Sequence, residues 1–284
     1  MQYSHYSYSL SELTQRSENI LNQQFQPDEL LAIYKTILGL IDLTTLNGND
    51  TAEKVKNLCR QAVAFENKEL GTPKTAAVCV YPVFAGTVSE ELKGTGIQTA
   101  CVAGAFPSGQ SPLAARLMEV NYALEHGADE IDMVISRGRL IEGDANFVLQ
   151  EVKAHKAACG DKHLKVILET GELKTPALIR QACEIALEGG ADFLKTSTGK
   201  VVPAATHEAV LIMLDTINEY FKSEGRKVGI KPAGGISTPH EALNYYLLVK
   251  DVLGEKWLNN QLFRIGASRL AGNLYQAIEE LATV

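Results

Sequence analysis

Eight short apolar segments made of strand-forming residues recur along the chain and alternate with longer segments of helical periodicity. Strands that alternate with helices predict a parallel sheet whose connections are right-handed crossovers. Eight such units within 284 residues fit a single (β/α)8 TIM barrel better than an open sheet. The expected strands lie within residues 38–46, 75–80, 97–104, 129–135, 163–170, 191–197, 227–233 and 262–268.

The segments between these strands carry helix signals. One of them, residues 175–190, repeats apolar residues at helical spacing, begins with Thr175 before Pro176 and ends with a Gly189-Gly190 pair. A capping residue before proline is typical of a helix start, and glycine of a helix end. The first strand ends in DLTTLN, without the glycine-rich turn that usually follows it in an open doubly wound sheet. Similar helices are expected within residues 51–65, 111–127 and 206–221.

The chain is expected to hold one domain. No linker rich in Pro, Gly or Ser and no low-complexity tract divides it, so the barrel is predicted to occupy residues 27–284, beginning with a helix over residues 27–38. Residues 1–26 are expected to form an N-terminal helical extension whose Tyr- and Ser-rich start is frayed.

Composition narrows the classes of function. The net charge is −7 and no basic stripe occurs, which argues against nucleic acid as a partner. No apolar run approaches the ~20 residues of a membrane span, and the N-terminus lacks the basic and apolar regions of a secretory signal. Five cysteines without a C-x-x-C pair indicate reduced thiols and a cytoplasmic location. Six histidines without H-x-H or H-E-x-x-H argue against a metal site.

Polar residues at the carboxyl ends of the strands are the first candidates for a site, because active sites of this fold lie there. Side chains alternate along a strand, so Lys165 and Glu169 are expected to share one face of the fifth strand. A single lysine after a strand is usually solvated, but several ionisable groups at one barrel mouth need partners. The candidates are Asp42, Thr44, Cys79, Asp132, Lys165, Lys195 and Lys231, with Cys79 also interpreted as a small core residue.

The lysines indicate a specific chemistry. A partly desolvated lysine beside a second cation has a lowered pKa, so a free amine exists near neutral pH. Such an amine can attack a carbonyl group to form a Schiff base, which then acts as an electron sink for carbon–carbon cleavage. Lys195 is the predicted nucleophile, Lys231 the cation that perturbs it and Asp132 the proton-transfer group, with Lys165 in the same network.

Turns that contain glycine and serine follow the last three expected strands. Loops at this position often bind phosphate in a TIM barrel, because glycines let backbone N–H groups approach the anion. The turns therefore predict a phosphate site. Its candidate residues are Thr198, Gly199, Lys200, Gly234, Gly235, Ser237, Gly266, Ser268 and Arg269.

Seven blocks of sequence resemble one family. IDLTTLN, AVCVYP, GADEIDMV, LKVILETGELK, DFLKTSTGK, KPAGGI and FRIGAS run in order from Ile41 to Ser268 and resemble the deoxyribose-phosphate aldolase family. The resemblance implies a class I aldolase on a (β/α)8 barrel that interconverts 2-deoxy-D-ribose 5-phosphate with acetaldehyde and glyceraldehyde 3-phosphate. It also implies that no metal or organic cofactor is needed, that the role is cytoplasmic and catabolic, and that the protein is a monomer or homodimer.

The resemblance assigns roles to the same residues. Lys195 in DFLKTSTGK matches the Schiff-base lysine, Lys231 in KPAGG the second active-site lysine, and Asp132 in DEIDMV the aspartate of the proton relay. Asp42 in IDLTTLN matches a residue near the substrate, and Lys200 with the glycine turns matches the hydroxyl and phosphate end.

Ser237 departs from the family pattern. Many members have Arg where this chain has Ser237 after the glycine pair, and the loss of that cation weakens the expected phosphate site. Arg269, at the turn after the eighth strand, is expected to supply the missing charge.

Two other functions stay open. A Schiff-base enzyme of the transaldolase kind would act on another sugar phosphate and would need a roomier donor pocket with hydroxyl partners. A non-catalytic sugar-phosphate sensor would be expected to lack Lys195, Lys231 or Asp132, and all three are present.

Overall fold

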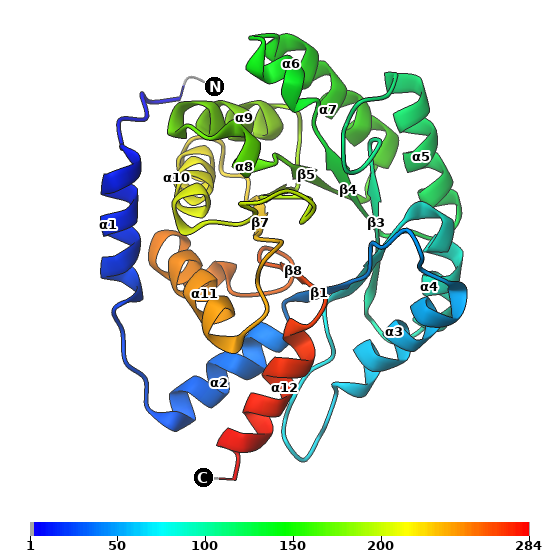
Figure 1. The fold of residues 1–284 in the computed structure, drawn as a ribbon, viewed down its shortest axis with the longest axis vertical. Helices are drawn as coiled ribbons and strands as arrows, with labels where there is room; N and C mark the ends of the chain where they lie inside the picture. Colours follow the sequence, from blue (N-terminus) through cyan, green and yellow to red (C-terminus); the bar gives the residue numbers. More distant parts are fainter. Residues whose placement is uncertain (1–2, 284) are drawn as a thin grey trace.

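Eight parallel strands form a barrel inside a ring of helices in the computed structural model, which describes residues 3–283 (Figure 1). The strands follow the order β7-β6-β5-β4-β3-β2-β1-β8, and parallel bridges join Ile230 to Phe263 and Ala233 to Gly266, so that the barrel nearly closes. The predicted TIM barrel is confirmed, and every strand lies within its expected segment. The strands are β1 (Ile41–Thr44), β2 (Ala77–Val80), β3 (Gln98–Ala103), β4 (Glu130–Val134), β5 (His163–Ile167), β6 (Phe193–Lys195), β7 (Gly229–Lys231) and β8 (Ile265–Ala267).

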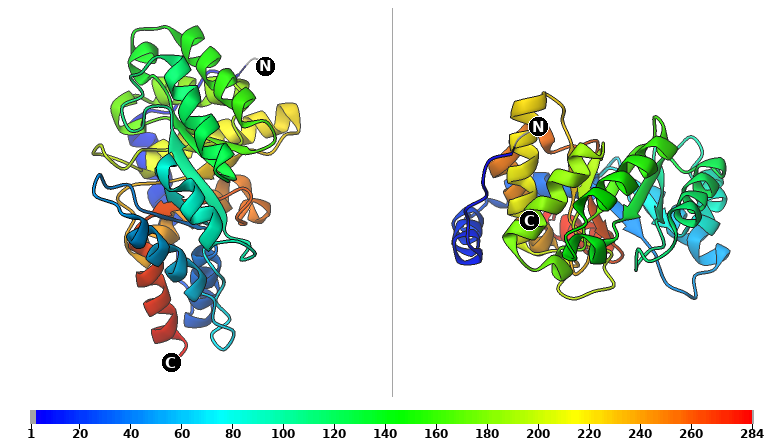
Figure 2. Two further views of the ribbon diagram at one scale, coloured as in Figure 1. Left: turned by 90° about the vertical axis from the view of Figure 1, so that its right-hand side faces the viewer. Right: turned by 90° about the horizontal axis from the view of Figure 1, so that it is seen from above.

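Helices surround the strands on all sides, as the two turned views in Figure 2 show. The helix predicted over residues 27–38 is confirmed as α2 (Pro27–Leu38). The other α-helices within residues 3–283 are α1 (Leu10–Leu21), α3 (Ala52–Ala64), α4 (Ala85–Glu91), α5 (Leu113–Glu125), α6 (Arg137–Ile141), α7 (Ala145–Cys159), α8 (Thr170–Leu173), α9 (Pro176–Glu188), α10 (His207–Glu224), α11 (Pro239–Leu253) and α12 (Leu270–Leu281). Two short 3-10 helices are η1 (Pro82–Phe84) and η2 (Glu255–Trp257).

Threonine caps start the helices that follow the late strands. The Thr175 hydroxyl accepts a hydrogen bond from the Leu178 N–H, and α9 begins at the next residue, Pro176, as predicted. Thr206 and Thr238 cap α10 and α11 in the same way. Because a cap satisfies a free N–H group at the first turn, it fixes where the preceding loop ends. The caps of α10 and α11 therefore define the far ends of two loops predicted to bind phosphate.

The N-terminal extension forms the helix α1, and residues 3–9 before it have no regular secondary structure. Ser9 and Glu12 form a reciprocal capping box at the start of α1, which lies outside the helix ring against α10 and α11 (Figure 1, dark blue). Asp215 of α10 accepts hydrogen bonds from the Tyr6 hydroxyl at 2.8 Å and from Arg16 at 2.7 and 3.0 Å. These contacts strap the extension to the barrel. Residues 1 and 2, also expected to fray, lie outside the described residues.

The barrel interior has an apolar side and a charged side. β2 and β3 contribute small apolar side chains, whereas β1 and β4 to β7 carry buried charged residues. Because a charge inside a protein needs a partner, the charged side must be a connected network. The apolar side consists of Ala77, Cys79, Ala100, Val102 and Leu46.

Phe193 packs into the barrel at the level of the deeper charged residues. Its register partners are Lys165 on β5 and Gly229 on β7. A Cβ at Gly229 would lie 2.3 Å from the Phe193 ring, so only glycine leaves room for the ring in this position. The ring is almost fully buried and covers one side of the charged network with apolar surface.

Candidate active site

Three of the predicted residues meet at a single carboxylate oxygen. Lys195 and Lys231 are register partners on the adjacent strands β6 and β7. Both amines donate to Oδ2 of Asp132 on β4, each at 2.7 Å. The structure thus brings together the residues predicted as nucleophile, perturbing cation and proton-transfer group.

Asp42 and Lys165 join this cluster from β1 and β5. The Lys165 amine donates to Oδ1 of Asp132 at 3.0 Å. Oδ2 of Asp42 lies 2.5 Å from the Lys231 amine and 3.6 Å from the Lys165 amine. Asp42 and Lys165 are fully buried, so their contacts are with charged neighbours.

Sequence reasoning missed two members of the cluster, Glu130 and Arg264. Oε2 of Glu130 accepts from the Lys165 amine at 2.5 Å, and its Oε1 accepts from Arg264 at 2.8 Å. Arg264 also donates to Oδ1 of Asp42 at 2.7 Å. A signal for both was present, because Glu130 has the same strand parity as Asp132, and Arg264 stands between two apolar residues just before β8.

The pKa values of the two lysines that share Asp132 are shifted in opposite directions. Burial lowers the pKa of Lys195, Asp132 opposes that effect and the positive charge of Lys231 adds to it, so that the pKa of Lys195 falls below its usual range. Burial also acts on Lys231, but Asp132 and Asp42 outweigh it and raise the pKa of Lys231. Lys195 is therefore the lysine that can lose its proton, and Lys231 is the one that keeps it.

The other charged groups of the cluster are held in their ionised forms. Burial by itself would raise the pKa of Asp132, but Lys165, Lys195 and Lys231 hold it well below its usual range. Burial acts in the same direction on Glu130, whose pKa is nevertheless lowered, chiefly by Lys165. The remaining three groups follow the same rule. Lys231, Arg264 and Lys165 lower the pKa of Asp42 although burial would raise it. Neighbouring carboxylates raise the pKa values of Lys165 and Arg264 although burial would lower them.

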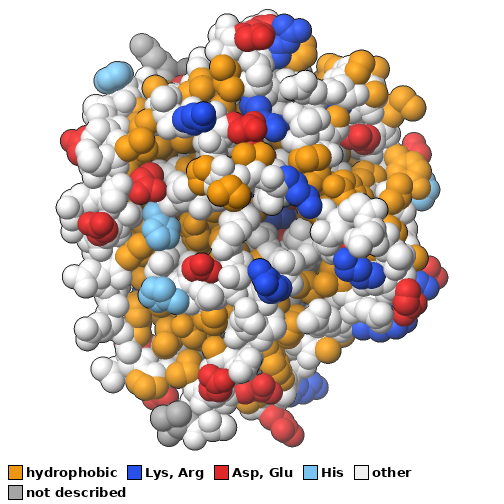
Figure 3. All heavy atoms as spheres, in the orientation of Figure 1, with side chains coloured by type: hydrophobic (Ala, Val, Ile, Leu, Met, Phe, Trp, Pro, Cys, Tyr) orange, Lys and Arg blue, Asp and Glu red, His pale blue; other side chains and the backbone are white. Residues whose placement is uncertain are grey.

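A cavity of about 430 Å³ opens above the cluster at the carboxyl ends of the strands. Lys195 lines it although the residue is only 3% exposed, whereas Asp132 and Lys231 lie beneath it. Figure 3 shows Lys and Arg side chains around the hollow near the centre of this face. Of the predicted binding residues, those that line the cavity are Thr44, Thr198, Gly199, Lys200, Gly234, Gly235, Ser237, Gly266, Ser268 and Arg269.

Asp42, Lys165 and Cys79 do not line this cavity. The first two belong to the charged cluster, and Cys79 packs with the small apolar side chains of β2 and β3. Burial raises the pKa of the Cys79 thiol, so it stays protonated near neutral pH. The interpretation of Cys79 as a small core residue fits this place, and its predicted substrate contact is not part of the cavity wall.

Two glycine turns approach each other at the rim of the cavity. Gly199 and Gly234 have φ of +76° and +83°, and a Cβ at Gly234 would lie 2.9 Å from the Gly199 Cα. Both conformations favour glycine, and the close approach leaves no room for a side chain. The loops after β6 and β7 therefore meet here with exposed backbone.

The cations at the rim differ in their contacts. The Lys200 amine donates to the Leu46 carbonyl at 2.5 Å and so ties the loop after β6 to the loop after β1. Lys54, which sequence reasoning did not single out, also lines the cavity and pairs with Asp50 at 2.5 Å. Arg269 is exposed and has no ion pair or side-chain hydrogen bond within residues 3–283. Within residues 3–283, Arg269 is therefore a rim cation that can bind an anion without first breaking a contact with the protein.

Glu169 lies beyond the fifth strand, so the prediction that it shares a face of that strand with Lys165 is wrong. β5 ends at Ile167, and Glu169 has a left-handed backbone with φ of 56°. Its carboxylate accepts from the Thr198 hydroxyl at 2.5 Å and from the Thr198 N–H at 3.3 Å. Glu169 therefore holds the loop that follows Lys195.

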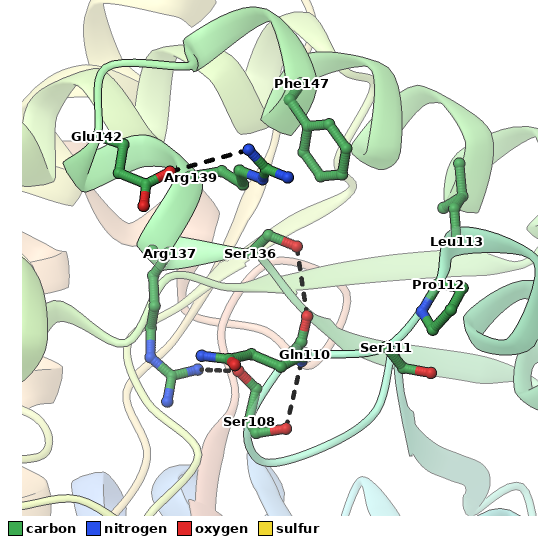
Figure 4. Close-up of a pocket in the computed structure, with 12 residues that line it drawn as sticks. Ser108, Gln110, Ser111, Pro112, Leu113, Ser136, Arg137, Arg139, Glu142 and Phe147 are labelled. Carbon is green, nitrogen blue, oxygen red and sulfur yellow. Dashed lines mark hydrogen bonds and ion pairs between the residues drawn. The ribbon is translucent and has the colours of Figure 1, made fainter.

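A second hollow, of about 550 Å³, lies beside the loops after β3 and β4 (Figure 4). Arg137 turns toward the loop after β3 and donates to the Pro107 and Ser108 carbonyls at 3.0 Å. Arg139 on the opposite wall lies 3.8 Å from Glu142. None of the residues predicted for the site lines this hollow.

Within residues 3–283, no helix combines the length and the hydropathy that a membrane crossing requires. The same stretch contains no group of three or more His, Cys, Asp and Glu side chains placed to hold a metal ion.

Comparison with known proteins places the chain among aldolases. The sequence pattern of the family described as DeoC/LacD family aldolase matches residues 36–247. The deoxyribose-phosphate aldolase of Homo sapiens is 43% identical over 249 residues, which cover 84% of this chain and 78% of that protein. A crystal structure from Toxoplasma gondii ME49 has a TM-score of 0.80 at 28% identity, covering 92% of this chain and all of that one. The tetrameric deoxyribose phosphate aldolase of Aeropyrum pernix has a TM-score of 0.67 at 25% identity, covering 96% and 100%.

Proposed function

The chain belongs to the DeoC/LacD family of aldolases, and from this premise we propose that it cleaves 2-deoxy-D-ribose 5-phosphate reversibly to glyceraldehyde 3-phosphate and acetaldehyde. The observation that carries the proposal is the pairing of Lys195 and Lys231 on one oxygen of Asp132, with Lys195 at the cavity wall. A lysine with a lowered pKa, next to a cation that keeps its proton, is the arrangement that Schiff-base catalysis needs.

The reaction starts at the Lys195 amine. The free Nζ adds to the C1 aldehyde of the open-chain sugar, and loss of water gives a protonated imine. Removal of the C3 hydroxyl proton then breaks the C2–C3 bond, and its electron pair moves into the imine to give an enamine. Glyceraldehyde 3-phosphate leaves, the enamine takes a proton at C2, and hydrolysis releases acetaldehyde and the free Lys195 amine.

Asp132 and Lys231 support these proton transfers without forming the covalent bond. The ionised Asp132 carboxylate contacts both amines, so through an ordered water it can accept and return the proton that moves at C3 and C2. Lys231, held in its charged form, lowers the proton affinity of Lys195 and can stabilise the negative charge that develops on the C3 oxygen as its proton is removed.

The rim of the cavity supports the assignment of the phosphate end. Gly199, Gly234 and Gly235 present backbone there, and Arg269 supplies a cation without a protein partner within residues 3–283. We propose that these groups take the phosphate, with Arg269 in place of the arginine that many members have at the position of Ser237. Lys200 is placed to take a sugar hydroxyl once it leaves the Leu46 carbonyl.

The wider account is also a proposal. Residues 27–284 would act as a single aldolase domain without metal or organic cofactor, in the cytoplasm, in the breakdown of deoxyribonucleotides. Residues 3–26 would serve as a strap on its outer helices. A monomer or a homodimer would suit this role.

The decisive assay for the activity compares donors. Purified protein is expected to release acetaldehyde from 2-deoxy-D-ribose 5-phosphate, measured by coupled reduction with NADH and alcohol dehydrogenase, and to show no turnover with fructose 6-phosphate, a dihydroxyacetone donor. Turnover of fructose 6-phosphate instead would favour the transaldolase-type reading. Binding of the sugar phosphate without any turnover would favour the sensor.

A further inference from the structure

The buried cluster contains one more cation than it has carboxylates. Within residues 3–283, the three carboxylates of Asp42, Glu130 and Asp132 are linked by ion pairs to four basic groups. These are Lys165, Lys195, Lys231 and Arg264, and every one of the seven residues is at most 3% exposed.

This count has a direct electrostatic consequence. Water screens surface charges, but an unbalanced charge in a buried cluster costs much more free energy. Three negative charges balance three positive charges, so the fourth basic group carries the least favourable charge. Arginine is not deprotonated in proteins. Lys165 and Lys231 each contact two or more carboxylates, whereas the only carboxylate that Lys195 contacts within residues 3–283 is that of Asp132.

We propose that Arg264 and Glu130 are positioning residues that set the protonation of Lys195 from the far side of the barrel, through the charge balance of this cluster. The charge balance thereby keeps the Lys195 amine neutral, which is the form that the proposed function, on which this rests, requires. Neither residue lines the substrate cavity.

A continuous chain of contacts carries the effect. Arg264 pairs with Asp42, Asp42 pairs with Lys231, and Lys231 shares Oδ2 of Asp132 with Lys195. A parallel chain runs from Arg264 through Glu130 and Lys165 to Oδ1 of Asp132. Without Arg264, Asp42 and Glu130 would draw Lys231 and Lys165 away from Asp132, and Asp132 would then favour a protonated Lys195.

The surroundings of the cluster contribute few other charges. The Arg264 guanidinium and the Lys165 amine lie 5.8 and 5.9 Å from the centre of the Phe193 ring, which covers them on the β6 side. Cys79 faces the cluster from β2 as a neutral thiol. His163 on β5 lies 3.5 Å from Oε1 of Glu130 and adds a charge only when it is protonated. Cys101 on β3 is a buried thiol whose pKa is also raised by burial.

The balance predicts opposite effects for two substitutions. Arg264→Met removes a cation, so a protonated Lys195 would restore neutrality and its pKa should rise. Glu130→Gln removes a carboxylate, so a protonated Lys195 becomes still less favourable and its pKa should fall. Each shift is expected to be on the order of 1 pH unit. The double variant restores the balance and should return close to the wild-type value.

The test is a titration of the Lys195 resonance in full-length protein labelled with ¹³C at lysine Cε, assigned by its loss in Lys195→Arg. Opposite shifts in Arg264→Met and Glu130→Gln, with the double variant near wild type, are expected. Shifts of the same sign, or no shift in either variant, would overturn the proposal. Because this readout needs no turnover, it can succeed even if the proposed reaction is wrong, and an aldolase with unmoved titrations would refute the inference alone.

Two further variants control for lost stability. Arg264→Lys keeps the charge and should keep the wild-type titration even if the protein melts earlier. Arg116→Met breaks another buried ion pair, which lies outside the barrel interior. In this pair Arg116 Nη1 is 2.7 Å from Oε2 of Glu151. This substitution should lower the melting temperature without moving Lys195. If Arg264→Met does not fold, the downward shift in Glu130→Gln and the unchanged Arg264→Lys value decide the matter, and a shift in Arg116→Met would contradict the proposal.

Discussion

Lys195 and Lys231 face each other as register partners on β6 and β7, and their amines donate to the same oxygen, Oδ2 of Asp132, at the same distance of 2.7 Å. The two residues differ in what else they contact. Lys231 also lies 2.5 Å from Asp42, whereas Lys195 reaches the cavity wall. The pKa of Lys231 is thereby raised and that of Lys195 lowered, and Lys195 is the proposed reactive amine.

Lys231→Leu should move the acidic limb of the kcat/KM profile to higher pH and reduce activity. The acidic limb reports the pKa of the free enzyme's essential base, and loss of a neighbouring cation should raise the pKa of Lys195 by roughly 1–3 units. The measurement is a pH series of kcat/KM with 2-deoxy-D-ribose 5-phosphate. Lys156→Leu, which removes a lysine paired with Asp192 on the outside of the barrel, is the matched control. A limb that stays in place in Lys231→Leu would remove Lys231 from this role.

Arg269→Ala should selectively weaken binding of the phosphorylated substrate. Arg269 lines the rim of the cavity, and a charge-assisted contact to phosphate would raise KM roughly tenfold or more when lost. The comparison is KM for 2-deoxy-D-ribose 5-phosphate against KM for plain 2-deoxyribose. Arg139→Ala, in the hollow of Figure 4, serves as the control and should change neither value. Equal effects of Arg269→Ala on both substrates would show that the residue does not bind the phosphate.

Gly229→Ala should destabilise the barrel. The new Cβ would lie 2.3 Å from the Phe193 ring, and overpacking of this kind typically costs about 1–3 kcal/mol. Gly272→Ala is the counterpart, because Gly272 lies within α12 with open space around its Cβ position and alanine favours a helix by about 1 kcal/mol. Urea unfolding of both variants measures the difference. A Gly229→Ala protein as stable as wild type would mean that the ring does not depend on glycine at that position.

Asp215→Ala should loosen the N-terminal strap without affecting catalysis. Asp215 accepts hydrogen bonds from Tyr6 and Arg16, but the pair is partly exposed, so the loss should be only about 1 kcal/mol. Limited proteolysis should then cut within residues 3–26 more readily, while kcat/KM stays at the wild-type value. Asp251→Ala, an exposed acid on α11, is the control. A large fall in kcat/KM would show that the strap influences the site.

Much of the fold could be predicted because its signals are local. Each strand is a short apolar run, and Thr175-Pro176 marks the start of α9 by capping chemistry alone. The start of α1 carried a similar signal, the Ser9-x-x-Glu12 capping box, which was obscured by the Tyr- and Ser-rich residues before it. Glu169 escaped prediction because its left-handed backbone breaks the alternation that a strand would impose.

Only part of the candidate site could be predicted from the sequence, and the reason lies in the geometry of the barrel. Lys195, Lys231 and Asp132 lie near strand ends, where barrel geometry alone makes them candidates. Arg264 and Glu130 lie deeper, and their importance comes from pairing across the barrel with Asp42 and Lys165. Such pairs join residues far apart in sequence, so strand parity could show that Arg264 and Glu130 point inward but not which partners they meet.

The most direct test of the account is to trap the imine. Protein incubated with acetaldehyde and reduced with sodium borohydride should carry a two-carbon adduct on the peptide that contains Lys195, and Lys195→Arg should carry none there. Peptide mass mapping locates the adduct. Its presence on Lys195 would establish the nucleophile and the donor together. An adduct on Lys231 or Lys200, or no adduct in folded protein that binds the sugar phosphate, would contradict the central claim.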